Sequence, residues 1–404
     1  MDSRREPPSR AFAFALGLVA LIAPLAVHLF LPVIPAAKAA LALSDAAAQL
    51  NFSVALFAMA VATLAYGSLS DRYGRRPLLL SGLALFLLGS AIAAIAQSAT
   101  ALMLGRLVQA AGAGCSTTLV RTIARDAYRA DQLVRAIAYL TMFYTLGPMI
   151  APLLGGVLID TLGWRSVFGL ALIAGSAITL AAYLAIGETR PDVDHAEADV
   201  GLLRGYAELF RRPQFVGYVL QSGFNSAAFM TMASASATLM KELLQRPSSE
   251  FGLYFLLFPF GFFFGNLISS RIGPRASNES MVLAGALLAM TTLALQALLL
   301  LSGVVTPWTF FLPGFFLTFS QGISLPYSQV GAMSVIPRLA GTAAGVGVFM
   351  QSMGGALFSQ LYGVFADGTP VPMVAILLCA GVLGVAAGAT PFVWARRTGA
   401  RGRG

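Results

Sequence analysis

Two side chains that can hold a proton or a positive charge lie inside long apolar stretches of the sequence, His28 and Arg106. An arginine within a membrane helix costs roughly 2.5 kcal/mol or more to insert, so Arg106 is expected to face a cavity or a partner. An imidazole titrates near about pH 6.5 and can carry a proton across a membrane domain. No acid lies clearly inside an apolar stretch of the first half, since Asp45, Asp71 and Asp160 lie at stretch ends. His28 is therefore the best protonatable group near mid-membrane in that half.

Each of these two residues also has a plainer interpretation. Arg106 lies about one turn from the end of its apolar stretch, so its guanidinium could snorkel to the membrane surface. His28 could be a hydrogen-bonding residue of a cavity, with proton coupling weak or located elsewhere. The residue types alone leave both interpretations open.

The elements that must position these side chains are membrane spans. Of 404 residues, 57% are hydrophobic and only 11% are charged, whereas a soluble domain carries roughly 25% charged residues. Twelve spans of ~20 residues would need about 240 residues, which is close to the hydrophobic fraction. This composition excludes a soluble enzyme, an ordinary nucleic-acid-binding protein and a disordered chain, and the long apolar stretches exclude a membrane β-barrel. We expect an all-α polytopic membrane protein.

Twelve apolar stretches predict the spans, six on each side of a polar segment. They cover residues 11–35, 47–66, 78–98, 101–122, 136–159, 164–187, 213–240, 251–270, 280–302, 307–331, 341–365 and 371–395. The pattern predicts two six-span halves, 1–187 and 213–404, joined by a linker over 188–212. Two such halves suggest a duplicated unit.

The basic residues are distributed unevenly between alternate loops. With the N-terminus in the cytoplasm, 21 of the 26 lysines and arginines fall on the cytoplasmic side. Only Lys38, Arg165, Lys241 and Arg246 fall on the other side, and Arg106 lies within a span. This asymmetry predicts cytoplasmic termini and a cytoplasmic linker. It also removes the nucleic-acid partner that a net charge of +9 would otherwise suggest.

The residues needed for catalysis are sparse. The two cysteines, Cys115 and Cys379, lie in separate apolar stretches, and the second histidine, His195, lies in the linker. These residues predict neither a disulfide nor a metal cluster, and no phosphate-binding loop of a primary pump is present. The sequence therefore favours a protein that uses a gradient and no cofactor over a membrane-embedded enzyme, which remains an unfavoured alternative.

A charged loop framed by glycines follows the second apolar stretch. Its string is Gly67-Ser-Leu-Ser-Asp71-Arg72-Tyr-Gly74-Arg75-Arg76, and a fainter copy, from Gly265 to Arg275, follows the eighth. Glycines allow close helix approach, and an acid there can pair with arginines or with a helix N-terminus. Such charge pairs would break and re-form if the halves rock. A short cytoplasmic loop would need only the arginines. It would not need glycines and an aspartate at these fixed positions.

This loop resembles the signature of the major facilitator superfamily, Gly-x-Leu-Ala-Asp-Arg-x-Gly-Arg-Lys, and departs from it only at Ser70 and Arg76. Two further motifs resemble those of its drug:proton antiporters, namely Leu102-x-x-x-Arg106-x-x-Gln109 and Gly147-x-x-x-Ala151-Pro152-x-x-Gly155-Gly156. The chain is most similar to the bicyclomycin/chloramphenicol-resistance (Bcr/CflA) group of multidrug exporters. That similarity rests on Arg125-Asp126-x-Tyr128, Glu188-Thr189 and Ala340-Gly341-Thr342-Ala343.

The resemblance implies two six-helix bundles around a central cavity, alternating access and proton-driven export. It implies that Arg106 links the proton and substrate sites through hydrogen bonds. It also implies conformational gating by residues of the loop and of the fifth span. These are Gly67, Asp71, Arg72, Gly74, Arg75, Arg76, Gly147, Pro148, Pro152, Gly155 and Gly156.

The first span departs from this group at one informative position. Relatives usually carry an aspartate four residues before a proline, and here His28 precedes Pro32, with Phe30 in place of a common tyrosine. The hypothesis is that His28 is the proton carrier. A neutral or positive group there argues against cationic drugs and favours neutral, zwitterionic or anionic compounds.

The expected substrate-binding residues are polar and aromatic side chains on spans that the resemblance places beside the cavity. They are His28, Phe30, Tyr139, Tyr144, Gln221, Asn225, Gln321 and Gln351. For any one of them, helix–helix hydrogen bonding or lipid contact is the alternative. We expect a monomer in a bacterial inner membrane that exports small amphiphilic compounds in exchange for protons. The alternative within transport is an exporter of one metabolite or amino acid.

Overall fold

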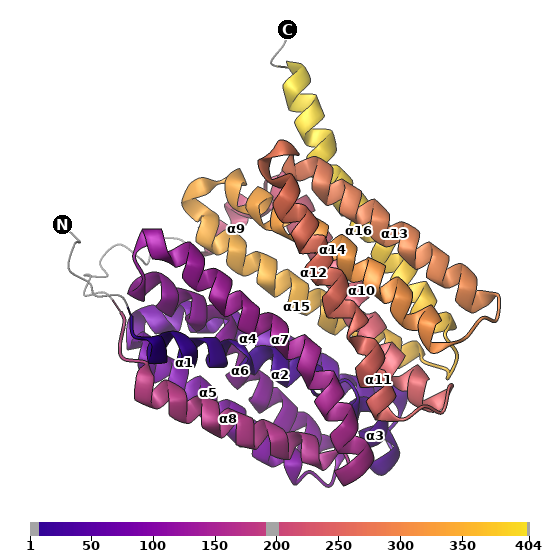
Figure 1. Cartoon of the computed structure of the whole chain (residues 1–404). Helices are drawn as coiled ribbons and strands as arrows, with labels where there is room; N and C mark the ends of the chain where they lie inside the picture. Colours follow the sequence, from indigo (N-terminus) through magenta and orange to yellow (C-terminus); the bar gives the residue numbers. More distant parts are fainter. Residues whose placement is uncertain (1–7, 191–201, 402–404) are drawn as a thin grey trace. The chain divides into compact units, whose positions relative to one another are not determined.

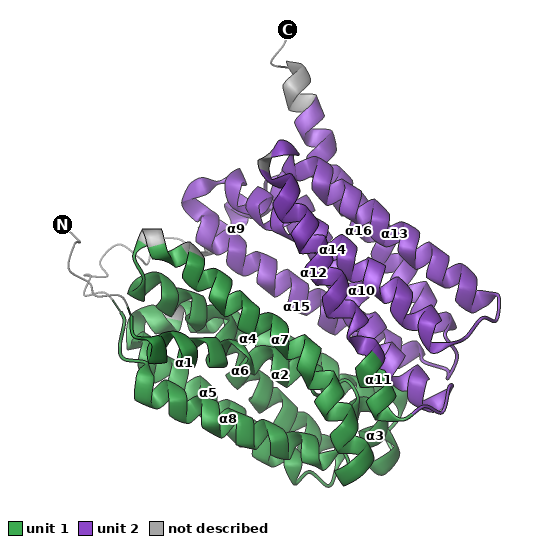
Figure 2. Ribbon diagram, in the orientation of Figure 1, with its two compact units in different colours: residues 1–194, 247–253 green, residues 195–246, 254–404 purple. Residues whose placement is uncertain are grey.

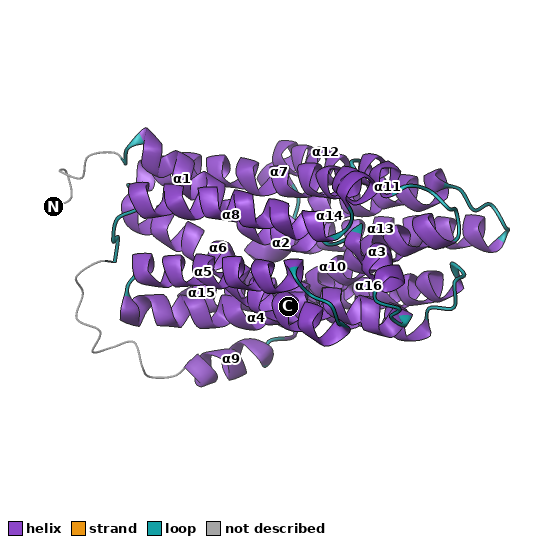
Figure 3. Ribbon diagram, turned by 90° about the horizontal axis from the view of Figure 1, so that it is seen from below, coloured by secondary structure: helices purple, strands orange, loops and turns teal. Residues whose placement is uncertain are grey.

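The chain is described by a computed structural model over residues 8–190 and 202–401. Within these ranges the regular elements are all helices, joined by turns and loops (Figures 1 and 3). The all-α prediction is therefore confirmed. The chain divides into two compact units, residues 1–194 with 247–253 and residues 195–246 with 254–404 (Figure 2). The predicted linker lies partly outside the described residues, so its role stays a prediction.

The first unit contains eight helices and the beginning of another. They are α1 (Arg10–Ala20), α2 (Ile22–His28), α3 (Val33–Ala40), α4 (Asp45–Tyr73), α5 (Arg75–Ala94), α6 (Ala99–Ala127), α7 (Ala130–Leu162) and α8 (Arg165–Ala185). The segment 247–253, which begins α11 (Ser248–Phe255), also belongs to this unit. The sequence did not predict that a piece of the second half would pack in the first unit.

The second unit contains the remaining helices. They are α9 (Leu202–Phe210), α10 (Pro213–Glu242), the end of α11, α12 (Leu257–Ile272), η1 (Gly273–Arg275), α13 (Asn278–Leu301), α14 (Pro307–Val335), η2 (Pro337–Leu339), α15 (Ala340–Phe365) and α16 (Val371–Arg401). In this unit α10 packs against α14, α15 and α16. The faint copy of the charged loop has a structural counterpart, because Gly74 and Gly273 each end a helix with a positive φ, 98° and 51°.

Two predicted spans are broken in the structure, and prolines explain the breaks. A proline cannot donate a backbone hydrogen bond, and its ring clashes with the carbonyl four residues earlier. Accordingly α1 ends at Ala20, four residues before Pro24, and α2 ends at His28, four residues before Pro32. In the same way α11 ends four residues before Pro259. His28 therefore lies at a helix end inside the first span.

Among the described residues, eight helices or helix runs are long and apolar enough to cross a membrane. The pair α14 and α15, which meet at 115°, adds one more by the same criterion. The long helices α6 and α10 fall outside this set. Both bury polar side chains, such as Arg106 and Gln109 in α6 and Gln221 and Asn225 in α10. The predicted twelve spans and cytoplasmic termini fit this arrangement.

Candidate functional site

The interior of the first unit holds a buried cation, Arg106, whose side chain is 1% exposed. Its Nη1 donates to the Ala26 carbonyl at 2.8 Å and to Oε1 of Gln109 at 2.5 Å. The guanidinium carbon lies 4.1 Å from the centre of the Phe30 ring. We name these four residues the interior arginine site. Because the guanidinium is buried among these partners, snorkelling does not describe its position.

The interior arginine site joins four helical segments of the unit. Ala26 lies on α2, Phe30 lies in the turn after α2, and Arg106 and Gln109 lie on α6. Gln109 extends the network by donating from Nε2 to Oγ of Ser90 on α5 at 2.8 Å. On α4, the Asn51 carbonyl oxygen lies 3.5 Å from Nε of Arg106. A movement of α2 relative to α6 would therefore act directly on the guanidinium.

The charge of Arg106 is not balanced by an acid in the described chain. Each acidic residue there lies in a loop or within three residues of a helix end, and no ion pair includes Arg106. A charge-assisted hydrogen bond contributes about 1.5–3 kcal/mol and a desolvated cation–π contact about 2 kcal/mol. These contacts are of the same order as the insertion cost of at least about 2.5 kcal/mol. These neutral contacts offset part of the cost of burying the charge, and Nη2 of Arg106 has no hydrogen-bond partner among the described residues.

His28 lies close to this site along the chain. It is the last residue of α2, two positions after Ala26, and is 5% exposed. Its burial in the first span agrees with the position that the sequence indicates. Its role as a proton carrier stays a prediction.

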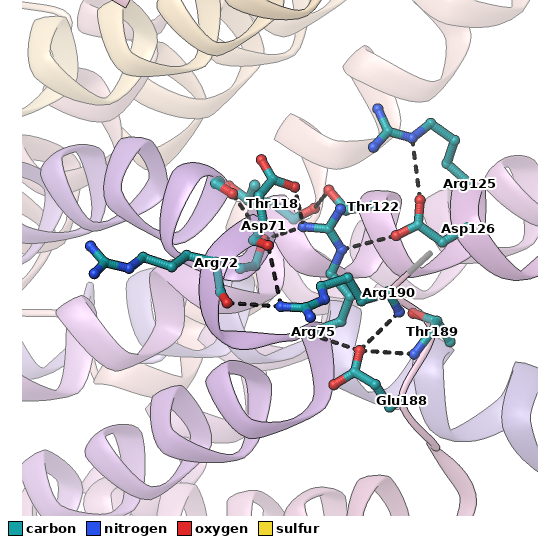
Figure 4. Close-up of polar contacts among 12 residues, drawn as sticks. Asp71, Arg72, Arg75, Thr118, Thr122, Arg125, Asp126, Glu188, Thr189 and Arg190 are labelled. Carbon is teal, nitrogen blue, oxygen red and sulfur yellow. Dashed lines mark hydrogen bonds and ion pairs between the residues drawn. The ribbon is translucent and has the colours of Figure 1, made fainter. Parts of the chain in front are cut away.

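A second group of charges joins the α4–α5 loop to the end of α6 (Figure 4). The Arg75 guanidinium contacts the Asp71 carboxylate at 2.6 Å and the Asp126 carboxylate at 2.9 Å. It also donates to Oγ of Ser70 at 2.6 Å. Arg75 and Asp126 are each 5% exposed, whereas Asp71 is 59% exposed. We name these four residues the loop cluster, and it brings together the acid and the arginine of the signature.

The segment after α8 closes over the same loop. The Glu188 carboxylate accepts hydrogen bonds from the backbone N–H groups of Arg75 and Arg76, at 2.9 and 3.2 Å. It also accepts from the N–H groups of Thr189 and Arg190, both at 2.9 Å. Glu188 thereby caps the first N–H groups of α5, which lack helical partners. We name this contact, together with Arg190, the Glu188 clasp.

Arg190 completes the clasp at the preceding helix. Its Nη1 donates to the Arg72 carbonyl at 2.8 Å, which satisfies a carbonyl at the end of α4. Gly74, between the two helices, has a φ of 98°, and a Cβ there would lie 2.6 Å from Oε2 of Glu188. Both the turn and the clasp therefore require glycine at this position.

The pKa of Glu188 reflects these contacts. Partial burial alone would raise the pKa of the carboxyl group. The hydrogen bonds from the N–H groups of Arg190, Arg75, Arg76 and Thr189 outweigh burial and hold the pKa below its ordinary value.

Other predicted gating residues of the loop have separate contacts. The Arg76 guanidinium donates to the Tyr183 carbonyl at 2.9 Å and lies 5.2 Å from the centre of that ring. The Arg72 guanidinium lies over the neighbouring Tyr73 ring. Gly67 faces Thr118 of α6 with room for ordinary contact. Arg76 thus joins the start of α5 to the end of α8, whereas the Arg72 contact is local to α4.

The glycines predicted for gating on α7 lie at two close contacts of this helix. A Cβ at Gly147 would overlap the side chain of Pro24, and one at Gly155 would lie 3.1 Å from Cγ of Pro32. A Cβ at Gly156 would overlap the Ser248 carbonyl oxygen. Pro148 and Pro152 lie inside α7, which continues through both of them to Leu162. Thus α7 packs closely on the first span at Gly147 and Gly155, and on the segment 247–253 at Gly156.

The predicted substrate-binding residues do not form one group. Phe30 belongs to the interior arginine site, and Tyr139 packs on the ring of Phe143 at 5.0 Å. Tyr144 is 47% exposed. Gln321 is buried on α14, whereas Gln351 is partly buried on α15 with its Nε2 atom enclosed. No contact among these residues marks a substrate site, so their role stays a prediction.

Gln221 and Asn225 converge inside the second unit. Each donates from its amide nitrogen to Oγ of Ser324 at 3.4 Å, and their carbonyl oxygens have no partner among the described residues. Both line a cavity of about 10 Å³ between α10, α13 and α16, which has room for about one water molecule. A drug-sized ligand needs roughly 300 Å³ or more. This cavity therefore suits a water molecule rather than a substrate.

Sequence reasoning missed several contacts of these sites. Asp126 and Glu188 were noted only as part of a resemblance, and Arg190 only as a basic residue. Their partners lie far away in the sequence, and no local pattern pairs them. A metal site is not indicated, since no group of three His, Cys, Asp or Glu side chains in the described chain could hold one.

Comparison with known proteins agrees with this architecture. A family model described as Major Facilitator Superfamily matches residues 16–359. The chain is 31% identical over 354 residues to Multidrug resistance protein D of Escherichia coli (strain K12), covering 86% of each. It is 22% identical over 367 residues to the Bicyclomycin resistance protein homolog of Haemophilus influenzae, covering 90% of this chain and 91% of that protein.

Solved structures show the same fold at low sequence identity. A bacterial homolog of the human lysosomal transporter Spinster, inward-facing and unoccupied, is similar with a TM-score of 0.75 at 18% identity, over 95% of this chain and 96% of that one. A D-xylose–proton symporter is similar with a TM-score of 0.72 at 15% identity, over 94% and 97%.

Proposed function

The chain belongs to the major facilitator superfamily, and we propose that it exports small amphiphilic compounds or drugs from the cytoplasm by proton antiport with alternating access. Its bacterial relatives and its apolar helices indicate a multi-pass protein of a bacterial inner membrane. The names of two relatives, a multidrug resistance protein and a bicyclomycin resistance protein homolog, support the class of cargo.

The interior arginine site is the observation that carries the proposal. It places a cation inside a membrane unit, holds it by neutral groups, and ties it to α2, α5 and α6. A permanent charge in such a position is characteristic of a path for ions or substrates. His28, two residues from Ala26, is the group that takes up and releases the proton. The proton gradient drives the cycle, and the monomer needs no cofactor.

The loop cluster and the Glu188 clasp serve the conformational change in this proposal. They hold the ends of α4, α5 and α6 in one arrangement through contacts of 2.6–3.2 Å. Ion pairs and helix caps of this kind can break and re-form together when a pair of helices moves. Gly147 and Gly155 provide the close contact at which α7 moves against the first span.

A metabolite or amino-acid exporter is the second candidate. One observation favours it. No acidic residue lies in the interior of the described spans, whereas Arg106 places a positive charge there. A positive interior suits zwitterionic or anionic compounds better than cationic drugs.

A compound-susceptibility panel tests the proposal and separates the two candidates. Cells that produce the protein, an Arg106→Gln variant, or neither are compared across antibiotics, dyes and toxic amino-acid analogues. Export predicts raised tolerance to a subset of compounds, with the variant resembling cells that lack the protein. Equal tolerance in all three strains would contradict export of the compounds tested.

A further inference from the structure

We propose that Asp160 latches the segment 247–253 onto the end of α7, and that this latch is released during the transport cycle. The proposal rests on the transport function proposed above. It adds a positioning residue that lies outside the signature motifs.

The latch consists of two hydrogen bonds from backbone groups to one carboxylate. Oδ1 of Asp160 accepts from the Ser248 N–H at 3.1 Å, and Oδ2 accepts from the Ser249 N–H at 2.8 Å. These serines begin α11, and the first N–H groups of a helix have no partner within it. A carboxylate is favoured there because the N-terminus of a helix carries a partial positive charge. Asp160 thus fixes the start of α11 to α7.

Two glycines bring the backbones into contact beside the carboxylate. Gly156 lies one helical turn before Asp160, and a Cβ there would overlap the Ser248 carbonyl oxygen. From the other side, a Cβ at Gly252 would lie 2.5 Å from the Pro152 carbonyl oxygen and 2.6 Å from Cα of Leu153. The segment therefore lies flush on α7, and it cannot leave α7 without losing both bonds to Asp160.

The connectivity of the chain gives this contact its significance. Residues 195–246 and 254–404 belong to the second unit, whereas 247–253 belongs to the first. The segment is thus a short piece of the second half of the sequence that the first unit holds.

No competing ion pair holds Asp160. Among the described residues it pairs with no lysine or arginine. Lys38 on α3 pairs with Asp45 at 2.5 Å, and Arg165 at the start of α8 donates to the Ala96 carbonyl at 2.8 Å. Glu250, in the first turn of α11, is an acid and adds no attraction to Asp160. The carboxylate is therefore available to the two backbone N–H groups.

Hydrogen–deuterium exchange of the full-length protein in lipid nanodiscs tests the latch without any substrate. The variants are Asp160→Ala, which removes both bonds, and Gly156→Ala, which keeps the carboxylate but forces the segment off α7. The matched control is Thr161→Ala, because the Thr161 hydroxyl donates only within its own helix. Asp160→Asn, which keeps one acceptor oxygen, serves if Asp160→Ala fails to fold.

We expect exchange in peptides covering 247–255 and 147–162 to rise about tenfold in both variants, as the loss of a charge-assisted hydrogen bond implies. Peptides of the loop cluster and the Thr161→Ala control should match the wild type. Unchanged exchange, or a rise confined to the amides of residues 248 and 249, would overturn the latch and leave a local helix cap. This measurement does not depend on export, so its failure is distinguishable from failure of the proposed function.

Discussion

Nε of Arg75 donates to the Asp126 carboxylate at 2.9 Å, and both side chains are 5% exposed. This buried pair joins the start of α5 to the end of α6, two helices that also carry Ser90 and Gln109 of the interior network. Asp71 contacts the same guanidinium from an exposed position. The arginine of the signature therefore has one buried and one exposed acidic partner.

Asp126→Asn should destabilise the protein more than Asp71→Asn. Removing one partner of a buried pair costs about 3–5 kcal/mol when nothing else compensates. Asp71 and Ser70 remain in contact with Arg75, so we expect a smaller loss of about 1–3 kcal/mol. Thermal unfolding in detergent measures the difference. An equal loss of stability in the two variants would show that burial of the Arg75–Asp126 pair does not add to the stability of the protein.

The Glu188 clasp should be sensitive to acid. The pKa of the Glu188 carboxyl group is lowered from the ordinary value of 4.5. The contribution of this carboxylate to stability is therefore fully present above that pH. The contribution falls as the pH drops through the lower pKa of the folded state. The difference in melting temperature between wild type and Glu188→Gln should be constant from pH 7 to about pH 5 and shrink below about pH 4.5. A difference that grows in acid would contradict the hydrogen bonds assigned to the carboxylate.

Arg106→Met should separate stability from transport. Methionine removes a buried charge that no acid in the described chain balances, which offsets the loss of two hydrogen bonds. We expect stability to change by less than about 2 kcal/mol, while transport falls to the background level. Unfolding and transport are measured on the same preparation. Retained transport would show that the guanidinium is a packing group.

Asn225→Leu tests the cavity of the second unit. The substitution replaces the Asn225 amide with an apolar side chain of similar size. It removes the hydrogen bond to Ser324 and also an oxygen that has no partner among the described residues. We assume that Asn225 holds a buried water molecule and not a substrate. We expect a change in stability within about 1 kcal/mol and an unchanged profile of exported compounds. A changed profile would place Asn225 on the substrate path instead.

Much of the fold follows from patterns that are local in the sequence. Apolar stretches of about one membrane thickness mark the spans, and prolines four residues downstream account for the ends of α1, α2 and α11. For Arg106 the sequence left burial and snorkelling open, and the contacts of the buried guanidinium decide for burial. The signature string placed Asp71 and Arg75 in one loop, where they do pair.

The contacts that could not be predicted join residues that are distant in the sequence. Glu188 caps a helix 113 residues earlier in the chain, and Asp160 binds a segment 88 residues later. A carboxylate that binds backbone N–H groups needs no particular residue type in its partner, so no pattern reveals the pair. The convergence of Gln221 and Asn225 on Ser324 could not be predicted for a related reason, since a helical i, i+4 pair shares a face without indicating what that face contacts.

The most direct test of proton antiport is a pH jump with purified protein in liposomes, using the compound that shows the largest effect in the susceptibility panel. With an acidic lumen, outward proton flow should drive accumulation of the compound inside and make the lumen more alkaline. A protonophore should abolish both signals, and His28→Ala should abolish the dependence on the gradient. Equal accumulation with and without the pH difference would contradict proton antiport, and wild-type gradient-driven transport by His28→Ala would remove His28 as the proton carrier.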